Sequence, residues 1–314
     1  MISLFYFGVG MLVLLLSSHA LVRAAETVSK VARISPLVIG ATVVALGTSL
    51  PELTVAIVAS AQKDVGLAMG NIIGANIINI LFVFPVGILI GKIRIGTTKT
   101  QRNAFLLLGA TALFIVLQTL AVPRAVSGGI LIFLALLFTV AEFTLGIRGR
   151  SYEDSKTFRK IKNGHFGPMR IIMIVLSVLG IVFGGITVVD SVEQISLITG
   201  LSTTILGLSM TSLATTLPEL LTTIFAQEEH QEKLTIGNII GSNIYNLMFV
   251  GGVASFFSTT GTVKPYEWVW LSVVILVFVT IIRRFKGEVI PKKVGYGLLG
   301  GFLLFMLFLY YLGR

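Results

Sequence analysis

Long apolar stretches follow one another along the whole chain, and they limit the possible folds more than any other feature. A helix needs about 20 apolar residues to cross the hydrocarbon core of a bilayer. Stretches of this kind lie near residues 2–22, 36–62, 66–90, 104–122, 125–146, 170–189, 200–226, 234–257, 266–282 and 294–312. We therefore predict an all-α membrane protein with ten transmembrane helices.

The composition agrees with this interpretation. Charged residues make up 12% of the 314 residues and the mean hydropathy is +0.95, whereas about 25% of the residues are charged in ordinary soluble domains. Ten crossings with short loops leave no room for a separate soluble domain. The chain contains no cysteine, which excludes disulfide frameworks, thiolate metal sites, iron–sulfur clusters and cysteine nucleophiles.

The basic residues that give the chain its net charge of +10 lie in short loops between the apolar stretches. The anionic cytoplasmic leaflet attracts such residues. We therefore interpret the charge as a topology signal, with the lipid bilayer as the partner rather than nucleic acid. Nothing in the sequence indicates an obligate protein partner.

The distribution of these basic residues predicts which side of the membrane each loop occupies. Loops after odd-numbered crossings hold 20 lysines and arginines and the opposite side holds four, so the odd loops are predicted to be cytoplasmic. Both termini are then extracellular in a multi-pass plasma-membrane protein. The longest polar stretch separates two halves of five crossings, which gives a first repeat over 1–147, a cytoplasmic connection over 148–169 and a second repeat over 170–314.

An internal repeat at one fixed offset supports this division. The shift that carries Gly40 onto Gly207 places PLVIGATVVALGTSLPELTVAI at 36–57 on TTILGLSMTSLATTLPELLTTI at 203–224. The same shift places GNIIGANIINILFV on GNIIGSNIYNLMFV, with ten of fourteen positions identical. Five crossings per half insert the two copies, at 36–83 and 203–250, in opposite orientations. Inverted repeats with broken helices that meet near the midplane are an architecture of secondary transporters.

Each copy of the repeat places one carboxylate deep in the membrane, Glu52 in the first and Glu219 in the second. An unpaired charge at that depth costs about 2.5–3.5 kcal/mol on insertion scales. No lysine or arginine lies at a comparable depth in any stretch. The compensating charge is therefore expected to be an ion or proton from outside the chain. A third carboxylate, Glu142, lies near a helix end and is expected to extend to the interface.

Oxygen-bearing groups surround both glutamates in the sequence. Pro51 and Pro218 lack an N–H, so they free the carbonyls of two residues that lie four positions earlier. Hydroxyls at Thr48, Ser49, Thr215 and Thr216 fall on the same helix face as the glutamates, and each partner helix contributes an asparagine, Asn79 or Asn246. An all-oxygen set of ligands favours Ca2+ or Na+ over zinc or copper.

The motifs GATVVALGTSLPEL and GNIIGANIIN, with their second copies, closely resemble the alpha-repeats of the cation/calcium antiporter superfamily, most of all its prokaryotic sodium/calcium exchangers. The resemblance covers essentially the whole chain. It implies a transporter without a cofactor that exchanges Ca2+ for Na+ by alternating access. Glu52 and Glu219 would bind Ca2+ with the backbone oxygens of Thr48 and Thr215. Na+ would use the backbone oxygens of Ala45 and Ser212, the glutamates, and the side chains of Ser49, Thr215, Thr216 and Ser242.

Two positions depart from the pattern of that superfamily. Ala75 occupies the place of a Na+-binding serine, and Asn246 occupies the place of an aspartate found in some relatives, including those that also move K+. The proton-coupled members of the superfamily are the alternative, since a glutamate that alternates between Ca2+ and H+ needs no Na+ ligands.

Two other classes of protein could use the same residues. An ion channel would bind ions with similar oxygens, but here the polar residues are concentrated at one level rather than along a continuous path. An intramembrane hydrolase could use paired carboxylates as acid and base, yet nothing else indicates a substrate pocket. We therefore expect a transporter and not an enzyme.

Overall fold

The protein is a bundle of helices, as the apolar stretches predict. The computed structural model describes residues 2–32, 35–61, 63–96, 98–120, 122–148, 168–197, 202–257 and 263–312. Within these ranges the only β-structure is a pair of isolated bridges, Arg94 to Val289 and Ile95 to Lys286. The predicted connection at 148–169 falls mostly on residues 149–167, which lie outside the described residues.

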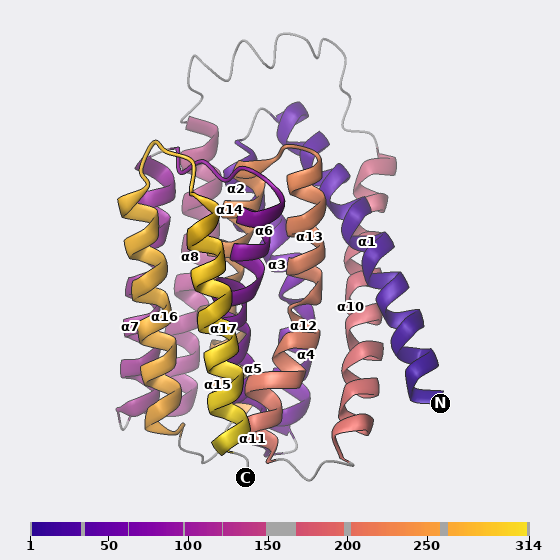
Figure 1. Ribbon diagram of the computed structural model, residues 1–314, viewed down its shortest axis with the longest axis vertical. Coiled ribbons are helices and arrows are strands. Elements are labelled where there is room, and N and C mark those ends of the chain that lie inside the picture. Colours follow the sequence, from indigo (N-terminus) through magenta and orange to yellow (C-terminus); the bar gives the residue numbers. More distant parts are fainter. Residues whose placement is uncertain are drawn as a thin grey trace.

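Six long helices each run through the bundle without a break. They are α1 (Ile2–Ala32), α7 (Thr98–Thr119), α8 (Arg124–Arg148), α10 (Pro168–Ser196), α16 (Pro265–Arg284) and α17 (Lys292–Leu312). In Figure 1, α1 begins and α17 ends at the same end of the bundle, opposite the end at which α8 finishes and α10 starts. The two ends of the described chain therefore lie on one side, as an even number of crossings requires.

The other four crossings are broken into shorter helices. The first copy of the repeat forms α2 (Pro36–Ile39), η1 (Gly40–Val44), α3 (Ala45–Thr48) and α4 (Leu50–Ala61), followed by α5 (Val65–Ile78), η2 (Asn79–Val83) and α6 (Phe84–Ile90). The second copy forms α11 (Thr203–Leu206), η3 (Gly207–Thr211), α12 (Ser212–Thr215) and α13 (Leu217–Glu228), followed by α14 (Glu232–Tyr245), η4 (Asn246–Val250) and α15 (Gly251–Phe257).

These breaks fall at equivalent positions in the two copies. The shift that relates the two copies carries η1 onto η3 and η2 onto η4, so all four π-helical segments obey it. Helix α3 stops at Ser49, with φ −82° and ψ 4°, and helix α12 stops at Thr216, with φ −80° and ψ −2°. A proline follows each of these residues by two positions, and it removes one backbone donor and clashes with the preceding turn. Since π-helical turns often occur at functional sites, the repeat concentrates irregular backbone where both glutamates lie.

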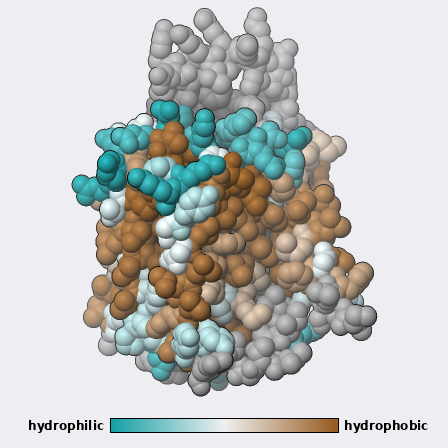
Figure 2. Space-filling model, viewed as in Figure 1, coloured by the Kyte–Doolittle hydropathy of each residue, from teal (hydrophilic) through white to brown (hydrophobic). Residues whose placement is uncertain are grey.

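Nine helical segments in the described part of the chain are long and apolar enough to cross a membrane. The predicted crossing near 200–226, which forms the broken helical run 203–228, is absent from that set. It is the counterpart of Pro36–Ala61 by the repeat, but its many threonines and serines lower its hydropathy. Figure 2 shows an apolar belt around the middle of the visible face, below a hydrophilic rim.

The core of the bundle contains the broken helices. Helix α14 of the second copy packs against α2, η1 and α3 of the first copy. Helix α5 of the first copy packs in the same way against α11, η3 and α12 of the second copy. Helices α1 and α10 pack side by side along their lengths at one edge of the bundle (Figure 1). Close approach is possible there because Gly10 and Gly184 face each other's backbone.

Candidate functional site

Two fully buried carboxylates mark the centre of the site. The side chains of Glu52, in the first turn of α4, and Glu219, in the first turn of α13, are both 0% exposed. The two groups are close enough to interact electrostatically. None of their four carboxylate oxygens accepts a hydrogen bond of ordinary geometry from a described residue. Burying two unpaired carboxylates together is unfavourable unless a cation or proton compensates them.

Hydroxyl groups face these carboxylates across the boundary between the two repeats. Thr215, from the second repeat, lies beside Glu52, and Thr48 and Ser49, from the first repeat, lie beside Glu219. Each glutamate is therefore approached by the broken helix of the opposite copy. One bound ion at this point would contact both halves of the protein.

The threonine hydroxyls form matching contacts in the two halves. Thr48 Oγ1 donates to the backbone oxygen of Ala45 at 3.3 Å, and Thr215 Oγ1 lies at the same distance from the backbone oxygen of Ser212. A further contact with Thr48 comes from Ser242 Oγ at 3.3 Å. These contacts place Ala45, Ser212 and Ser242 of the predicted set next to the two threonines.

The two halves differ at Ala75, the counterpart of Ser242. Ala75 is 0% exposed and carries a methyl group where Ser242 carries a hydroxyl. A second difference lies at the helix breaks. Thr216 Oγ1 donates to the backbone oxygen of Ser212 at 2.5 Å, whereas Ser49 Oγ has no hydrogen-bond partner among the described residues. The repeat is therefore symmetric in backbone and asymmetric in its supply of hydroxyl groups.

Asn79 and Asn246 begin the π-helical segments η2 and η4, and both are 0% exposed. Their segments pack against the glutamate-bearing helices of the opposite copy, η2 against α13 and η4 against α4. Neither amide forms a hydrogen bond with any described residue. They add further unsatisfied amide oxygens to the core, although no hydrogen bond joins them to the glutamates.

All eleven residues that the sequence indicates are thus buried in the core of the bundle. Each is at most 2% exposed: Ala45, Thr48, Ser49, Glu52, Asn79, Ser212, Thr215, Thr216, Glu219, Ser242 and Asn246.

Two further site residues were missed by the sequence analysis. Asn238 Oδ1 lies 3.4 Å from Thr48 Oγ1, and Asn71 Oδ1 lies 3.2 Å from Thr215 Oγ1, as alternative acceptors for the hydroxyl hydrogens that also face the backbone oxygens of Ala45 and Ser212. Each asparagine lies beside the threonine hydroxyl of the opposite repeat. Both are the asparagine of the GNIIG motif, so their equivalence in the two copies of the repeat was the available signal.

Glycines of the same motif allow the helices to cross closely enough for these contacts. A Cβ atom at Gly237 would collide with the backbone oxygen of Leu37 and lie 2.9 Å from the amide nitrogen of Ala41. In the other half, a Cβ atom at Gly70 would lie 2.8 Å from the backbone oxygen of Thr204. The glycines therefore serve packing, and the site depends on them indirectly.

The arrangement suits a hard cation. Its ligating atoms are carboxylate, hydroxyl, amide and backbone oxygens, which are the ligands that Ca2+ and Na+ prefer. No group of three or more His, Cys, Asp or Glu side chains gathers within the described ranges. Two carboxylates can balance the charge of one divalent or two monovalent cations.

Comparison with known proteins identifies the family. The model of the sodium/calcium exchanger protein family matches residues 2–141 and 169–312. The chain belongs to the sodium/calcium exchanger family. It is therefore a cation/Ca2+ antiporter, a membrane transporter rather than an enzyme.

Relatives of this exchanger cover nearly its full length. The inner membrane protein YrbG of Escherichia coli is 30% identical over 313 residues, with 97% of this chain and 95% of the relative aligned. The sodium/calcium exchanger MaX1 of Methanosarcina acetivorans is 26% identical, with 90% and 93% of the two chains aligned.

A solved structure of the sodium-calcium exchanger NCX_Mj, soaked with Na+ and Sr2+, matches with a TM-score of 0.80. It is 25% identical and the match covers 98% of each chain. The predicted fold, two inverted repeats of five helices with broken helices in the centre, is confirmed.

Proposed function

We propose that this antiporter exchanges Ca2+ for Na+ across the plasma membrane. The observation that carries the proposal is the pair Glu52 and Glu219, whose four buried oxygens accept no hydrogen bond of ordinary geometry within the described ranges. Two carboxylates balance the charge of one Ca2+, and the neighbouring hydroxyl and backbone oxygens complete an oxygen shell. The names of MaX1 and NCX_Mj as sodium/calcium exchangers support the choice of ions.

Each predicted residue has a role in this proposal. Glu52, Glu219 and the backbone oxygens of Thr48 and Thr215 bind Ca2+. Na+ ions bind the same glutamates together with the backbone oxygens of Ala45 and Ser212 and the side chains of Ser49, Thr215, Thr216 and Ser242. Asn79 and Asn246 contribute amide oxygens. Because the two sets share the glutamates, Ca2+ and Na+ exclude each other.

Exchange follows from the cost of moving an empty site. Two unpaired negative charges in a low-dielectric environment oppose the change between inward-facing and outward-facing states. A site filled by Ca2+ or by Na+ is neutralised, so the protein can change between the two states. The closely packed pair α1 and α10 lies at the edge of the bundle, contacts α4 and α13, and is the pair that we expect to slide past the core.

The proposed topology places both termini outside. It treats 1–147 and 170–314 as inverted repeats and 148–169 as their cytoplasmic connection, on the basis of the 20 to four distribution of basic residues.

Proton coupling is the second candidate, and Ala75 is the observation that favours it. A methyl group at this buried position removes one oxygen from a Na+ site, whereas a glutamate that carries a proton needs no such ligand. The hydroxyls of Ser49, Thr216 and Ser242 favour Na+ coupling, because binding a proton does not require them.

Ca2+ uptake into proteoliposomes separates the two candidates. One preparation carries an outward Na+ gradient without a pH gradient, and the other carries an outward proton gradient with choline in place of Na+. We expect the Na+ gradient alone to drive uptake, and the Glu52→Gln variant serves as the inactive control. Uptake that requires the proton gradient and ignores Na+ would make this protein an H+/Ca2+ antiporter.

A further inference from the structure

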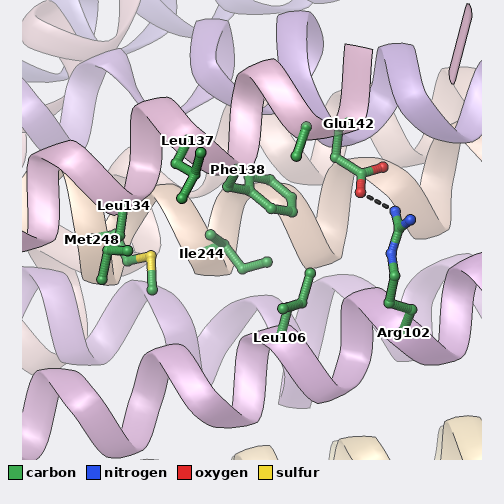
Figure 3. Close-up of a pocket in the computed structure, with 9 residues that line it drawn as sticks. Arg102, Leu106, Leu134, Leu137, Phe138, Glu142, Ile244 and Met248 are labelled. Carbon is green, nitrogen blue, oxygen red and sulfur yellow. Dashed lines mark hydrogen bonds and ion pairs between the residues drawn. The ribbon is translucent and has the colours of Figure 1, made fainter. Parts of the chain in front are cut away.

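A groove with a polar end lies between α7 and α8, away from the ion site (Figure 3). Its volume is about 280 Å3 and it is lined mainly by apolar side chains. Leu106 of α7 and Leu137 of α8, which form its two walls, are 45% and 52% exposed. Because both helices can cross the membrane, these exposed walls face the bilayer and the groove opens to lipid.

Glu142 and Arg102 form the polar end of the groove. The sequence led us to expect that Glu142 extends to the interface, but it is only 1% exposed and forms an ion pair with Arg102. This ion pair uses one carboxylate oxygen, and Glu142 Oε2 has no partner among the described residues. An unsatisfied buried carboxylate oxygen costs free energy unless a donor reaches it.

The guanidinium of Arg102 can donate further hydrogen bonds. Its Nε and Nη2 atoms donate to Asn103 Oδ1 at 3.1 and 2.9 Å, and Nη2 also contacts Glu142. These bonds to described residues leave the donors of Nη1 available. The side chain is 34% exposed, so a negatively charged group in the lipid layer can approach it.

This ion pair lies toward one end of two helices that are long enough to span the membrane. Arg102 lies one turn after the start of α7 at Thr98, and Glu142 lies near the end of α8 at Arg148. Other cations lie near the same end, including Arg283, whose guanidinium lies 5.5 Å from the ring of Phe105. From Glu142 the groove extends to Leu134, eight residues or about 12 Å along the helix toward the middle of the membrane.

We propose that this groove binds a phospholipid whose headgroup carries both a phosphate and a primary ammonium, as phosphatidylethanolamine does. The phosphate binds Arg102, the ammonium donates to Glu142 Oε2, and one acyl chain lies between Leu106 and Leu137. The floor of the groove is formed by Ile244 and Met248 (Figure 3). These two residues flank Asn246, so the bound chain packs against the segment that carries an ion-site residue. This proposal does not depend on whether Na+ or H+ drives transport.

Native mass spectrometry of the purified full chain tests the headgroup. Phosphatidylethanolamine and phosphatidylcholine with identical acyl chains share the phosphate, but choline has no N–H donor. We expect the protein to retain phosphatidylethanolamine at least several-fold better, and Glu142→Gln to reduce that preference while binding of both lipids persists. Equal retention of the two lipids by the unmodified protein would overturn the proposed role of Glu142.

A pair of tryptophan substitutions tests the location. Leu137→Trp obstructs the groove, whereas Val140→Trp, at a position on the same helix that is 62% exposed and does not line it, is the matched control. Both positions are on the exposed surface of α8, and gel filtration with thermal unfolding checks that each variant folds. We expect loss of the retained lipid in Leu137→Trp only. Equal retention in both folded variants would show that the lipid binds elsewhere. If Leu137→Trp does not fold, Leu106→Trp obstructs the opposite wall and is scored in the same way.

Discussion

The hydroxyl oxygens of Thr48 and Ser242 lie 3.3 Å apart and connect the first repeat to the second beside the two buried glutamates. The equivalent pair in the other half is Thr215 and Ala75, which cannot form this contact because Ala75 has no hydroxyl. The two halves therefore present different numbers of oxygens to an ion.

Ala75→Ser should tighten the apparent affinity for Na+ and steepen the Na+ dependence of Ca2+ efflux. The added ligand is worth on the order of 1 to 3 kcal/mol, less what water already supplies in the parent. Ca2+ affinity should change little, since Ala75 is outside the proposed Ca2+ shell. The measurement is Ca2+ efflux from proteoliposomes over a range of external Na+ concentrations.

Ala68→Ser is the matched control for that experiment. Ala68 is also 0% exposed and lies two turns earlier in α5. Its variant should retain the parent's Na+ dependence. If Ala75→Ser behaves in the same way, residue 75 does not belong to the ion site.

Glu52→Gln and Glu219→Gln should each abolish Ca2+ transport while the protein remains folded. Removing one charge leaves Ca2+ with a single balancing carboxylate in a buried site. Glu228→Gln removes a carboxylate from the exposed end of α13 and should leave transport unchanged. The readouts are Ca2+ flux in proteoliposomes and thermal unfolding in detergent; near-normal flux in either of the first two variants would exclude a two-glutamate site.

Gly237→Ala should destabilise the protein and reduce transport. The new methyl group would collide with the backbone of Leu37 and Ala41, and overpacking of this kind costs about 1–3 kcal/mol. Gly300→Ala, in α17, adds a methyl group where no atom lies within 4 Å, and it should have no such effect. Equal unfolding temperatures for the two variants would contradict the close crossing of α14 over α2 and η1.

Single cysteines should report the orientation in the membrane. Because the chain has no cysteine of its own, a cysteine at position 1, 160 or 314 gives a signal without background. A membrane-impermeant thiol reagent applied to intact cells should label positions 1 and 314 but not position 160. Labelling of position 160 from outside would reverse the proposed topology.

Much of the fold could be predicted from local properties of the sequence. Apolar stretches of helical length and the basic loops each reflect a physical requirement that acts within one segment or one loop, and the internal repeat shows that both halves meet the same requirements. The breaks at Ser49 and Thr216 could be anticipated as well, since Pro51 and Pro218 disturb the helix wherever they occur. The carboxylates of Glu52 and Glu219 stood out because a charge at that depth is costly in any arrangement.

Contacts between distant segments were decided only by the tertiary structure. Nothing local to Asn71 or Asn238 shows that its amide oxygen lies beside the hydroxyl of a threonine of the opposite repeat, 144 or 190 residues away. The same is true of Glu142. Its position near a helix end predicted an exposed carboxylate, but an ion pair with Arg102 on α7 allows it to be buried. Which side chains can satisfy one another depends on the crossing of helices, and the crossing depends on the packing of the whole bundle. The sequence by itself therefore determined the crossings, the repeat and the two acidic positions, and the structure determined which oxygens surround them.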